Sequence, residues 1–187
     1  RSTLFPYTTL FRSALAVFYE KDFRSAKMQD IARLADVSAS LLYSYFENKE
    51  KLFEGVVSSV PFDFDRIARE EESVLADTPS ERFRIAAEGP LLDMLAHHKR
   101  LVILVDKSRG TAYEHAKDDF VESIERHIRR MVNKRAPLRY PDLLAHVLAS
   151  NFVESLMEVA RHYSSEDEAR DMLALIAQCY YEGVNSL

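Results

Sequence analysis

Residues 27–52 read KMQDIARLADVSASLLYSYFENKEKL, and this stretch decides the fold. Apolar residues recur at helical spacing before and after a short polar interruption. The interruption holds Asp36, which tolerates a left-handed backbone, and Ser38, a favourable helix N-cap. A helix, a turn of about four residues and a second short helix read DNA when the second helix enters a major groove. The stretch therefore predicts a helix-turn-helix.

The spacing of apolar residues stays helical along the remainder of the chain. Only 4 glycines and 6 prolines occur in 187 residues, so long segments run without a backbone break. Such a composition favours helices over a sandwich of many short strands. The last two apolar stripes, about 142–163 and 166–187, are long, and Ser165 forms a capping box with Glu168 before the second. We therefore predict an all-α protein.

The composition argues against several classes of protein. A single cysteine, Cys179, cannot form an internal disulfide and is typical of the reducing cytoplasm. No apolar run approaches the roughly 20 residues that a membrane-spanning helix needs, so we expect no membrane partner. The net charge of −5 is unfavourable for a nucleic-acid binder, and residues 14–60 carry six basic against seven acidic side chains. This near-neutral balance predicts a shallow salt dependence for DNA binding.

The first 13 residues, RSTLFPYTTLFRS, differ in character from the rest. The tripeptide Thr-Leu-Phe occurs twice, Arg-Ser stands at both ends, and Pro6 interrupts any helical period. We interpret this segment as translated adaptor or cloning sequence that forms a non-native or disordered leader. The alternative is a genuine flexible arm.

The quoted stretch resembles the helix-turn-helix of TetR-type (TetR/AcrR) transcriptional regulators. The resemblance covers about residues 14–57, where apolar positions, turn, aromatic residues and a trailing lysine all coincide. It implies a three-helix DNA-binding domain, here 14–60 with the motif at about 27–46. It also implies a larger helical effector-binding and dimerisation domain, here 61–187. Such proteins act as homodimers on a pseudo-palindromic double-stranded operator.

The resemblance further implies which side chains contact DNA. Gln29 is placed to pair with adenine, the alternative being plain surface. Lys27 and Ser38 belong to the same surface. Base edges and phosphates are the expected partners of the remaining residues, with Ala39, Ser40, Leu41 and Ser44 facing bases and Tyr43, Tyr45 and Lys49 meeting phosphates.

Three positions depart from the usual pattern of the family. Asp36 stands where glycine is common, Ala39 where a basic residue is frequent, and Ser44 where histidine often occurs. Two polar or cationic contacts to DNA are therefore missing. We expect apolar contacts and DNA shape to matter more for sequence choice than bidentate hydrogen bonding.

The second domain offers two further sets of candidate residues. An unknown small-molecule effector is expected among the helices between residues 81 and 131, because an apolar run there has polar and aromatic neighbours. Simple core packing is the alternative. The effector candidates are His97, Leu101, Leu104, Tyr113 and Phe120. Two copies of the last two helices would form a four-helix bundle in the homodimer, with Leu148, Phe152, Leu156, Tyr163, Met172, Ile176, Tyr180 and Gly183 at the interface.

Enzymatic chemistry has no signature in the chain. A glycine-rich phosphate loop, a GxSxG elbow and the spacing of metal ligands are all missing from the sequence, so we expect no catalytic residue, metal or cofactor. The pattern favours a ligand-responsive regulator of transcription, a repressor, located in the cytoplasm. Two alternatives stay open: a helical enzyme whose site is built from distant residues, and an interaction module that keeps the fold without binding an operator.

Overall fold

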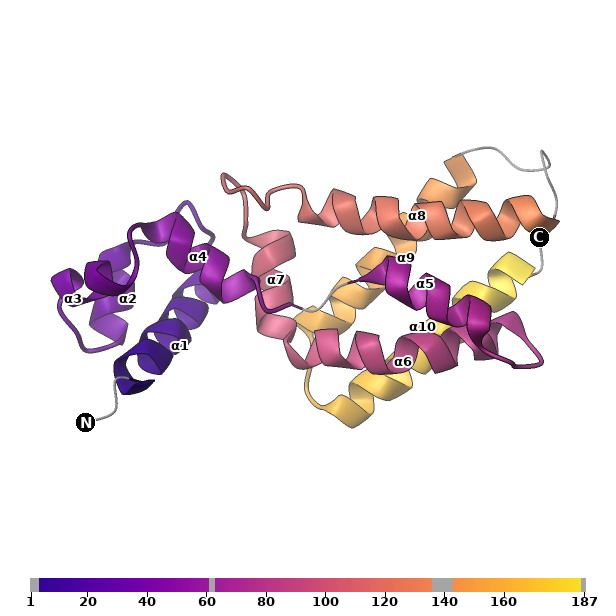
Figure 1. The fold of residues 1–187 in the computed structure, drawn as a ribbon, viewed down its shortest axis with the longest axis horizontal. Coiled ribbons are helices and arrows are strands. Elements are labelled where there is room, and N and C mark those ends of the chain that lie inside the picture. Colours follow the sequence, from indigo (N-terminus) through magenta and orange to yellow (C-terminus); the bar gives the residue numbers. More distant parts are fainter. Residues whose placement is uncertain (1–3, 61–62, 136–142, 186–187) are drawn as a thin grey trace. The chain divides into compact units, whose positions relative to one another are not determined.

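The computed structural model describes residues 4–60, 63–135 and 143–185, and their side chains over 7–60, 63–130 except Pro79, and 143–180. Ten helices and no strand are found in these ranges (Figure 1), which confirms the predicted all-α class. The helices are α1 (Leu4–Glu20), α2 (Met28–Leu34), α3 (Ala39–Tyr45), α4 (Lys49–Val57), α5 (Phe64–Ser73), α6 (Pro79–Ala96), α7 (His98–Asp106), α8 (Ala116–Arg135), α9 (Leu143–Arg161) and α10 (Glu166–Asn185).

The chain divides into two compact units. The first unit combines Arg1–Val60 with Lys99–Ala116, and the second combines Pro61–His98 with Lys117–Leu187. The expected division after residue 60 therefore differs in one respect: the segment that contains most of α7 belongs with the N-terminal helices. The Phe23 N–H explains part of this, because it donates a hydrogen bond to the Lys107 carbonyl at 2.9 Å.

Aromatic rings form the core of the first unit. Phe18, Phe23 and Phe53 are buried and contact one another, with ring centroids 5.1 to 6.3 Å apart. Tyr113 extends this group, since its ring lies 6.3 Å from that of Phe53. The pairs of Phe53 with Phe18 and Phe23 are edge-to-face, and such pairs add about 0.5–1.5 kcal/mol beyond the apolar area that they bury. These rings hold α1, α4 and the end of the segment Lys99–Ala116 together in one core.

The structure differs from our expectation for the first residues. It places Leu4–Ser13 in α1, where Leu10 and Ser13 are buried. Phe11 fills the space in front of Gly55, because a Cβ at Gly55 would lie 2.8 Å from the Phe11 ring. Pro6 is compatible with this helix because it stands in the first turn, where its missing N–H has no helical partner. The adaptor hypothesis concerns the origin of these residues and stays a prediction.

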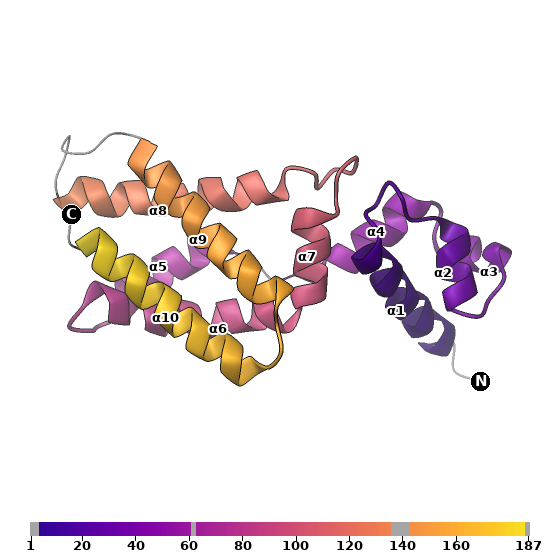
Figure 2. The same ribbon diagram turned by 180° about the vertical axis from the view of Figure 1, so that it is seen from behind.

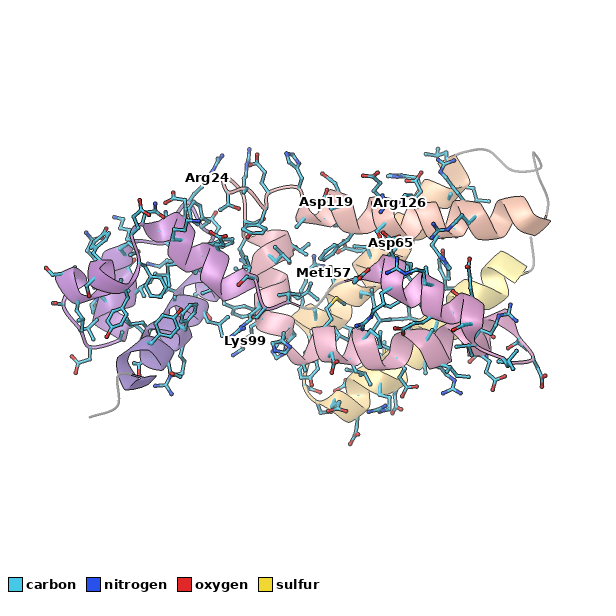
Figure 3. All side chains as sticks on the ribbon, in the orientation of Figure 1. Arg24, Asp65, Lys99, Asp119, Arg126 and Met157 are labelled. Carbon is cyan, nitrogen blue, oxygen red and sulfur yellow. The ribbon has the colours of Figure 1, made fainter. Side chains whose placement is uncertain are left out.

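The second unit packs five helices around another aromatic core. Phe64, Phe83, Phe152 and Tyr180 come from four different helices, and consecutive rings in this order lie 5.2 to 6.3 Å apart. On the surface, Asp65 of α5 faces Arg126 of α8 at 3.5 Å (Figure 3). Helices α9 and α10 lie next to each other (Figure 2).

Helix α9 is long and apolar enough to cross a membrane by length and composition alone. Its apolar side chains include the buried residues Ala149, Phe152, Leu156 and Met157, which pack inside the second unit. The core helix of a soluble protein passes the same test. Packing within the unit therefore accounts for most of the apolar character of α9.

Candidate functional site

A left-handed residue closes the turn between α2 and α3. Asp36 has a φ of 55°, the only positive value at a non-glycine residue in the described ranges. Its N–H donates to the Arg33 carbonyl at 3.2 Å, and the Val37 N–H donates to the Ala32 carbonyl at 3.0 Å. Carbonyls at the end of α2 thus keep hydrogen-bond partners through the turn. The chain reverses where the sequence indicates, with aspartate in the place usually taken by glycine.

Helix α3 begins at a capped residue and presents one face to solvent. The Ser38 hydroxyl oxygen accepts a hydrogen bond from the Leu41 N–H at 3.1 Å, as the sequence predicts. Leu42 and Phe46 are buried and hold the helix against the rest of the first unit. The exposed side carries most of the predicted DNA contacts: Ser40, Leu41, Tyr43, Ser44 and Tyr45 are exposed, and Ala39 is half-buried.

Lys49 takes a position that we did not predict. Its Nζ donates to the carbonyl oxygens of Phe23 at 2.7 Å and Ala26 at 3.0 Å. The same ammonium lies 4.3 Å from the centroid of the Phe23 ring, a cation–π contact. Two of its three N–H donors are therefore used inside the first unit, where they join α4 to the segment between α1 and α2. Nothing in the sequence indicates this role, because the two acceptors are backbone carbonyls that come close to Lys49 only in the folded chain.

The start of α2 carries exposed polar residues beside a neutralised carboxylate. Lys27 and Gln29 are exposed, as a role in DNA contact requires. Lys21 Nζ donates to Asp30 at 2.7 Å, and Arg33 pairs with the other oxygen of that carboxylate. The hydrogen bond from Lys21 holds the pKa of Asp30 below its usual value, so the carboxylate stays charged and paired. Both basic partners therefore neutralise the one carboxylate of α2.

Leu34 is an exposed apolar residue of α2. Its spacing from Ile31 is helical, as expected for an apolar stripe, but 56% of the residue is exposed. The buried positions of this helix are Met28, Ile31 and Ala32. A seven-residue helix offers two turns, so one apolar residue falls outside the buried arc. The exposed apolar surface of the motif is therefore larger than the sequence indicates.

Comparison with known proteins identifies the first unit. Residues 10–56 match the family model described as bacterial regulatory proteins, tetR family. The chain carries a TetR-type helix-turn-helix. The match confirms the resemblance, and its residues coincide with α1 to α4. No curated protein matches the chain.

Solved structures of TetR-type proteins share the fold over nearly the whole chain. NalD of Pseudomonas aeruginosa, the secondary repressor of the MexAB-OprM multidrug efflux pump, is 17% identical, with 92% of this chain and 94% of NalD covered and a TM-score of 0.59. A TetR-like regulator from Rhodococcus sp. RHA1 is 21% identical, with 92% and 93% covered and a TM-score of 0.60. AibR, solved with isovaleryl coenzyme A and operator DNA, is 16% identical, with 90% and 96% covered and a TM-score of 0.56. At these identities the similarity shows the fold.

The predicted effector residues are divided between the two units. Leu101 and Leu104 are buried in α7, and Tyr113 is half-buried beside Phe53, all in the first unit. His97 is exposed at the end of α6, and Phe120 is half-buried on α8, both in the second unit. Sequence proximity suggested one cavity, but α7 returns to the N-terminal helices. The structure does not gather the five residues within one unit.

The predicted interface residues of α9 and α10 fall into three groups. Phe152 and Leu156 are buried in the core of their own subunit, so they are not available to a partner. The exposed and half-buried members are Leu148, Tyr163, Met172, Ile176 and Tyr180, whereas Gly183 lies outside the residues whose side chains are described. Sequence analysis missed three exposed apolar residues on these helices: Leu143, Val147 and Leu175. A helix that is apolar on two faces does not reveal which face the core takes.

A buried polar cluster in the second unit also escaped the sequence analysis. Glu71 of α5 and His127 of α8 are 5% and 7% exposed, and their Oε2 and Nε2 atoms lie 3.1 Å apart. The ring of Phe64 meets His127 edge-on at 5.6 Å. Burial, together with the charge of Glu71, raises the pKa of Tyr180 well above its usual value. Glu71 stands among charged residues in the sequence, but its spacing from Phe64, Ile67 and Ala68 puts it on the buried face of α5.

Proposed function

We propose that this protein is a cytoplasmic, ligand-responsive repressor of transcription that binds a pseudo-palindromic operator as a homodimer. The observation that carries this proposal is the TetR-type helix-turn-helix with an exposed, capped α3. NalD is named as a repressor, and AibR was solved with both a ligand and operator DNA. These relatives support the proposal, since they have the same fold.

DNA binding is tested by selecting fragments from a random double-stranded pool with the purified full-length protein. We expect enrichment of two inverted half-sites whose centres lie one helical turn, or a multiple, apart. A Tyr43→Ala/Tyr45→Ala variant should bind the selected DNA more weakly, since both exposed phenols lie on α3. A Ser73→Ala variant in the second unit is the matched control. Retention of no fragment above background at low salt would favour the interaction module instead.

Homodimerisation is supported by the surface of α9 and α10. Leu143 and Val147 on α9, and Met172 and Leu175 on α10, are exposed apolar residues. A groove of about 370 Å³ runs between these helices, lined by residues such as Val159, Tyr163, Met172 and Ile176. Helix pairs of this kind bury their apolar faces in a four-helix bundle.

The dimer is tested by light scattering at micromolar concentration. We expect a dimer for the wild type and a monomer for Met172→Glu/Leu175→Glu, because two charges would be buried in the interface. Leu75→Glu is the matched control: Leu75 is 98% exposed, between α5 and α6, and its substitution should leave the dimer intact. A wild-type monomer would contradict this part of the proposal.

We place the effector site in the second unit, on the basis of a cavity of about 230 Å³ between α6 and α10. Phe83, Leu91 and Leu173 are among its apolar residues, and four charged residues also line it: Arg84, Glu88, Arg170 and Asp171. Apolar cavities with a few polar groups are typical of small-molecule sites. A thermal-shift search should find a compound that raises the Tm and also changes operator affinity. A compound with the first effect alone would not act as an effector.

A further inference from the structure

Helix α3 lacks the side chains that usually distinguish bases by hydrogen bonding. Its sequence, ASLLYSY, holds no arginine, lysine, asparagine or glutamine. Guanine is commonly recognised by arginine or lysine, and adenine by asparagine or glutamine, through pairs of hydrogen bonds. Whatever base choice α3 makes must therefore come from hydroxyl groups or apolar contacts.

Two of the serines at α3 already serve the helix itself. The Ser38 oxygen accepts from the Leu41 N–H, and the Ser44 hydroxyl donates to the Leu41 carbonyl at 2.7 Å. Ser40 keeps an exposed hydroxyl, but a hydroxyl both donates and accepts, so it pairs with several bases. Hydrogen bonds from α3 thus distinguish poorly between the four bases.

Leu41 is the exposed aliphatic side chain of α3, whereas Ala39, the other aliphatic candidate for a base contact, is half-buried. It comes three positions after the cap, is 37% exposed and directly follows the exposed Ser40, whereas the next residue, Leu42, is buried. In a major groove, the one apolar feature that marks a base pair is the C5 methyl group of thymine. Burial of one methyl group against a leucine is worth about 0.8 kcal/mol, or about fourfold in affinity.

We infer that Leu41 packs against the C5 methyl group of a thymine in each half-site, so that thymine methyls select the operator. This inference rests on the proposed DNA binding and adds the chemical group that α3 recognises. Replacement of thymine by uracil removes only that methyl group and leaves the hydrogen-bonding edge of the base unchanged. Uracil-containing DNA is therefore a clean probe.

The test is a uracil scan of the selected operator with the full-length protein. Each thymine is replaced in turn, and affinity is measured for the wild type, Leu41→Ala and the control Leu34→Ala, whose side chain is exposed on α2. We expect at least one thymine per half-site at which uracil weakens wild type and Leu34→Ala about fourfold but leaves Leu41→Ala unchanged. Thermal unfolding confirms that each variant is folded.

Three outcomes would overturn the inference. Tight wild-type binding with every uracil tolerated would reject methyl recognition while leaving the proposed function intact. Equal sensitivity of wild type and Leu41→Ala to the same uracil would assign the contact to another residue. Failure of the wild type to bind any DNA would remove the proposed function together with this inference.

Discussion

The two units differ in how they stabilise a polar side chain: one uses backbone carbonyls and the other uses a side chain from another helix. In the first unit the lysine that reaches inward, Lys49, is met by backbone carbonyls and a phenylalanine ring close to it in the fold. In the second unit the buried carboxylate of Glu71 is met by an imidazole from another helix, surrounded by aromatic side chains. A backbone acceptor accompanies any sequence, whereas a buried side-chain partner must be encoded separately. The two acceptors of Lys49 thus do not depend on the side chains at 23 and 26, whereas the partner of Glu71 is lost when His127 is replaced.

The largest effect should come from Glu71. We expect Glu71→Leu to lower the free energy of unfolding by about 3 kcal/mol, because His127 then loses the partner for a buried polar group. Urea unfolding of the full-length protein, followed by circular dichroism, measures this. The exposed neighbour Glu70→Leu should change it by less than about 0.5 kcal/mol.

The double variant Glu71→Leu/His127→Leu sharpens the same comparison. Replacing both members of a buried pair with apolar residues is often close to neutral, so the double variant should recover most of the stability. A loss below about 1 kcal/mol for Glu71→Leu alone would remove the contrast between the units.

Lys49 provides the corresponding test in the first unit. Lys49→Met should lower the free energy of unfolding by about 2 kcal/mol, because two charge-assisted hydrogen bonds and a cation–π contact are lost. Lys51→Met is the control on the same helix, since Lys51 is exposed and pairs only locally with Glu54 at 2.8 Å.

Salt dependence separates this structural role of Lys49 from the phosphate contact that the family resemblance implies. If Lys49→Met leaves stability unchanged but lowers the slope of log Kd against log salt by about one per subunit, the phosphate role holds. If stability falls and the slope for the remaining folded protein is unchanged, the structural role holds.

The smallest effect concerns the turn. Asp36→Gly should raise the free energy of unfolding by about 0.5 kcal/mol. Glycine adopts a φ of 55° without the steric cost of a Cβ, and this gain is partly offset because glycine increases the entropy of the unfolded chain. Asp36→Ala should lower the free energy of unfolding by about 1 kcal/mol, because alanine keeps the Cβ but loses the short polar side chain that makes the left-handed conformation accessible to aspartate. Equal stability of the two variants, measured by thermal unfolding, would show that the backbone at this position carries no strain.

The helix-turn-helix could be predicted from sequence because its signals are local. Ser38 caps its own helix, and Asp36 turns its own backbone. Phe46 is the exception, because its ring packs against Tyr7 and Phe11 of α1. The second unit depends on pairings between distant segments. Two apolar faces of α9 look alike in sequence, so Phe152 was assigned to the interface although it is core. The spacing of α5 indicates that Glu71 faces inward, but its partner His127 comes from α8 and could not be predicted from α5.

The return of Lys99–Ala116 to the first unit has a consequence for biosynthesis and for communication. During translation, the Lys107 carbonyl that receives the Phe23 N–H becomes available only after α5 and α6 have been made. The DNA-binding unit therefore reaches its final set of contacts only after part of the second unit has left the ribosome. The chain also passes between the units three times, after residues 60, 98 and 116. A conformational change in one unit can thus act on the other through three backbone connections, whereas two domains joined by one linker have a single connection.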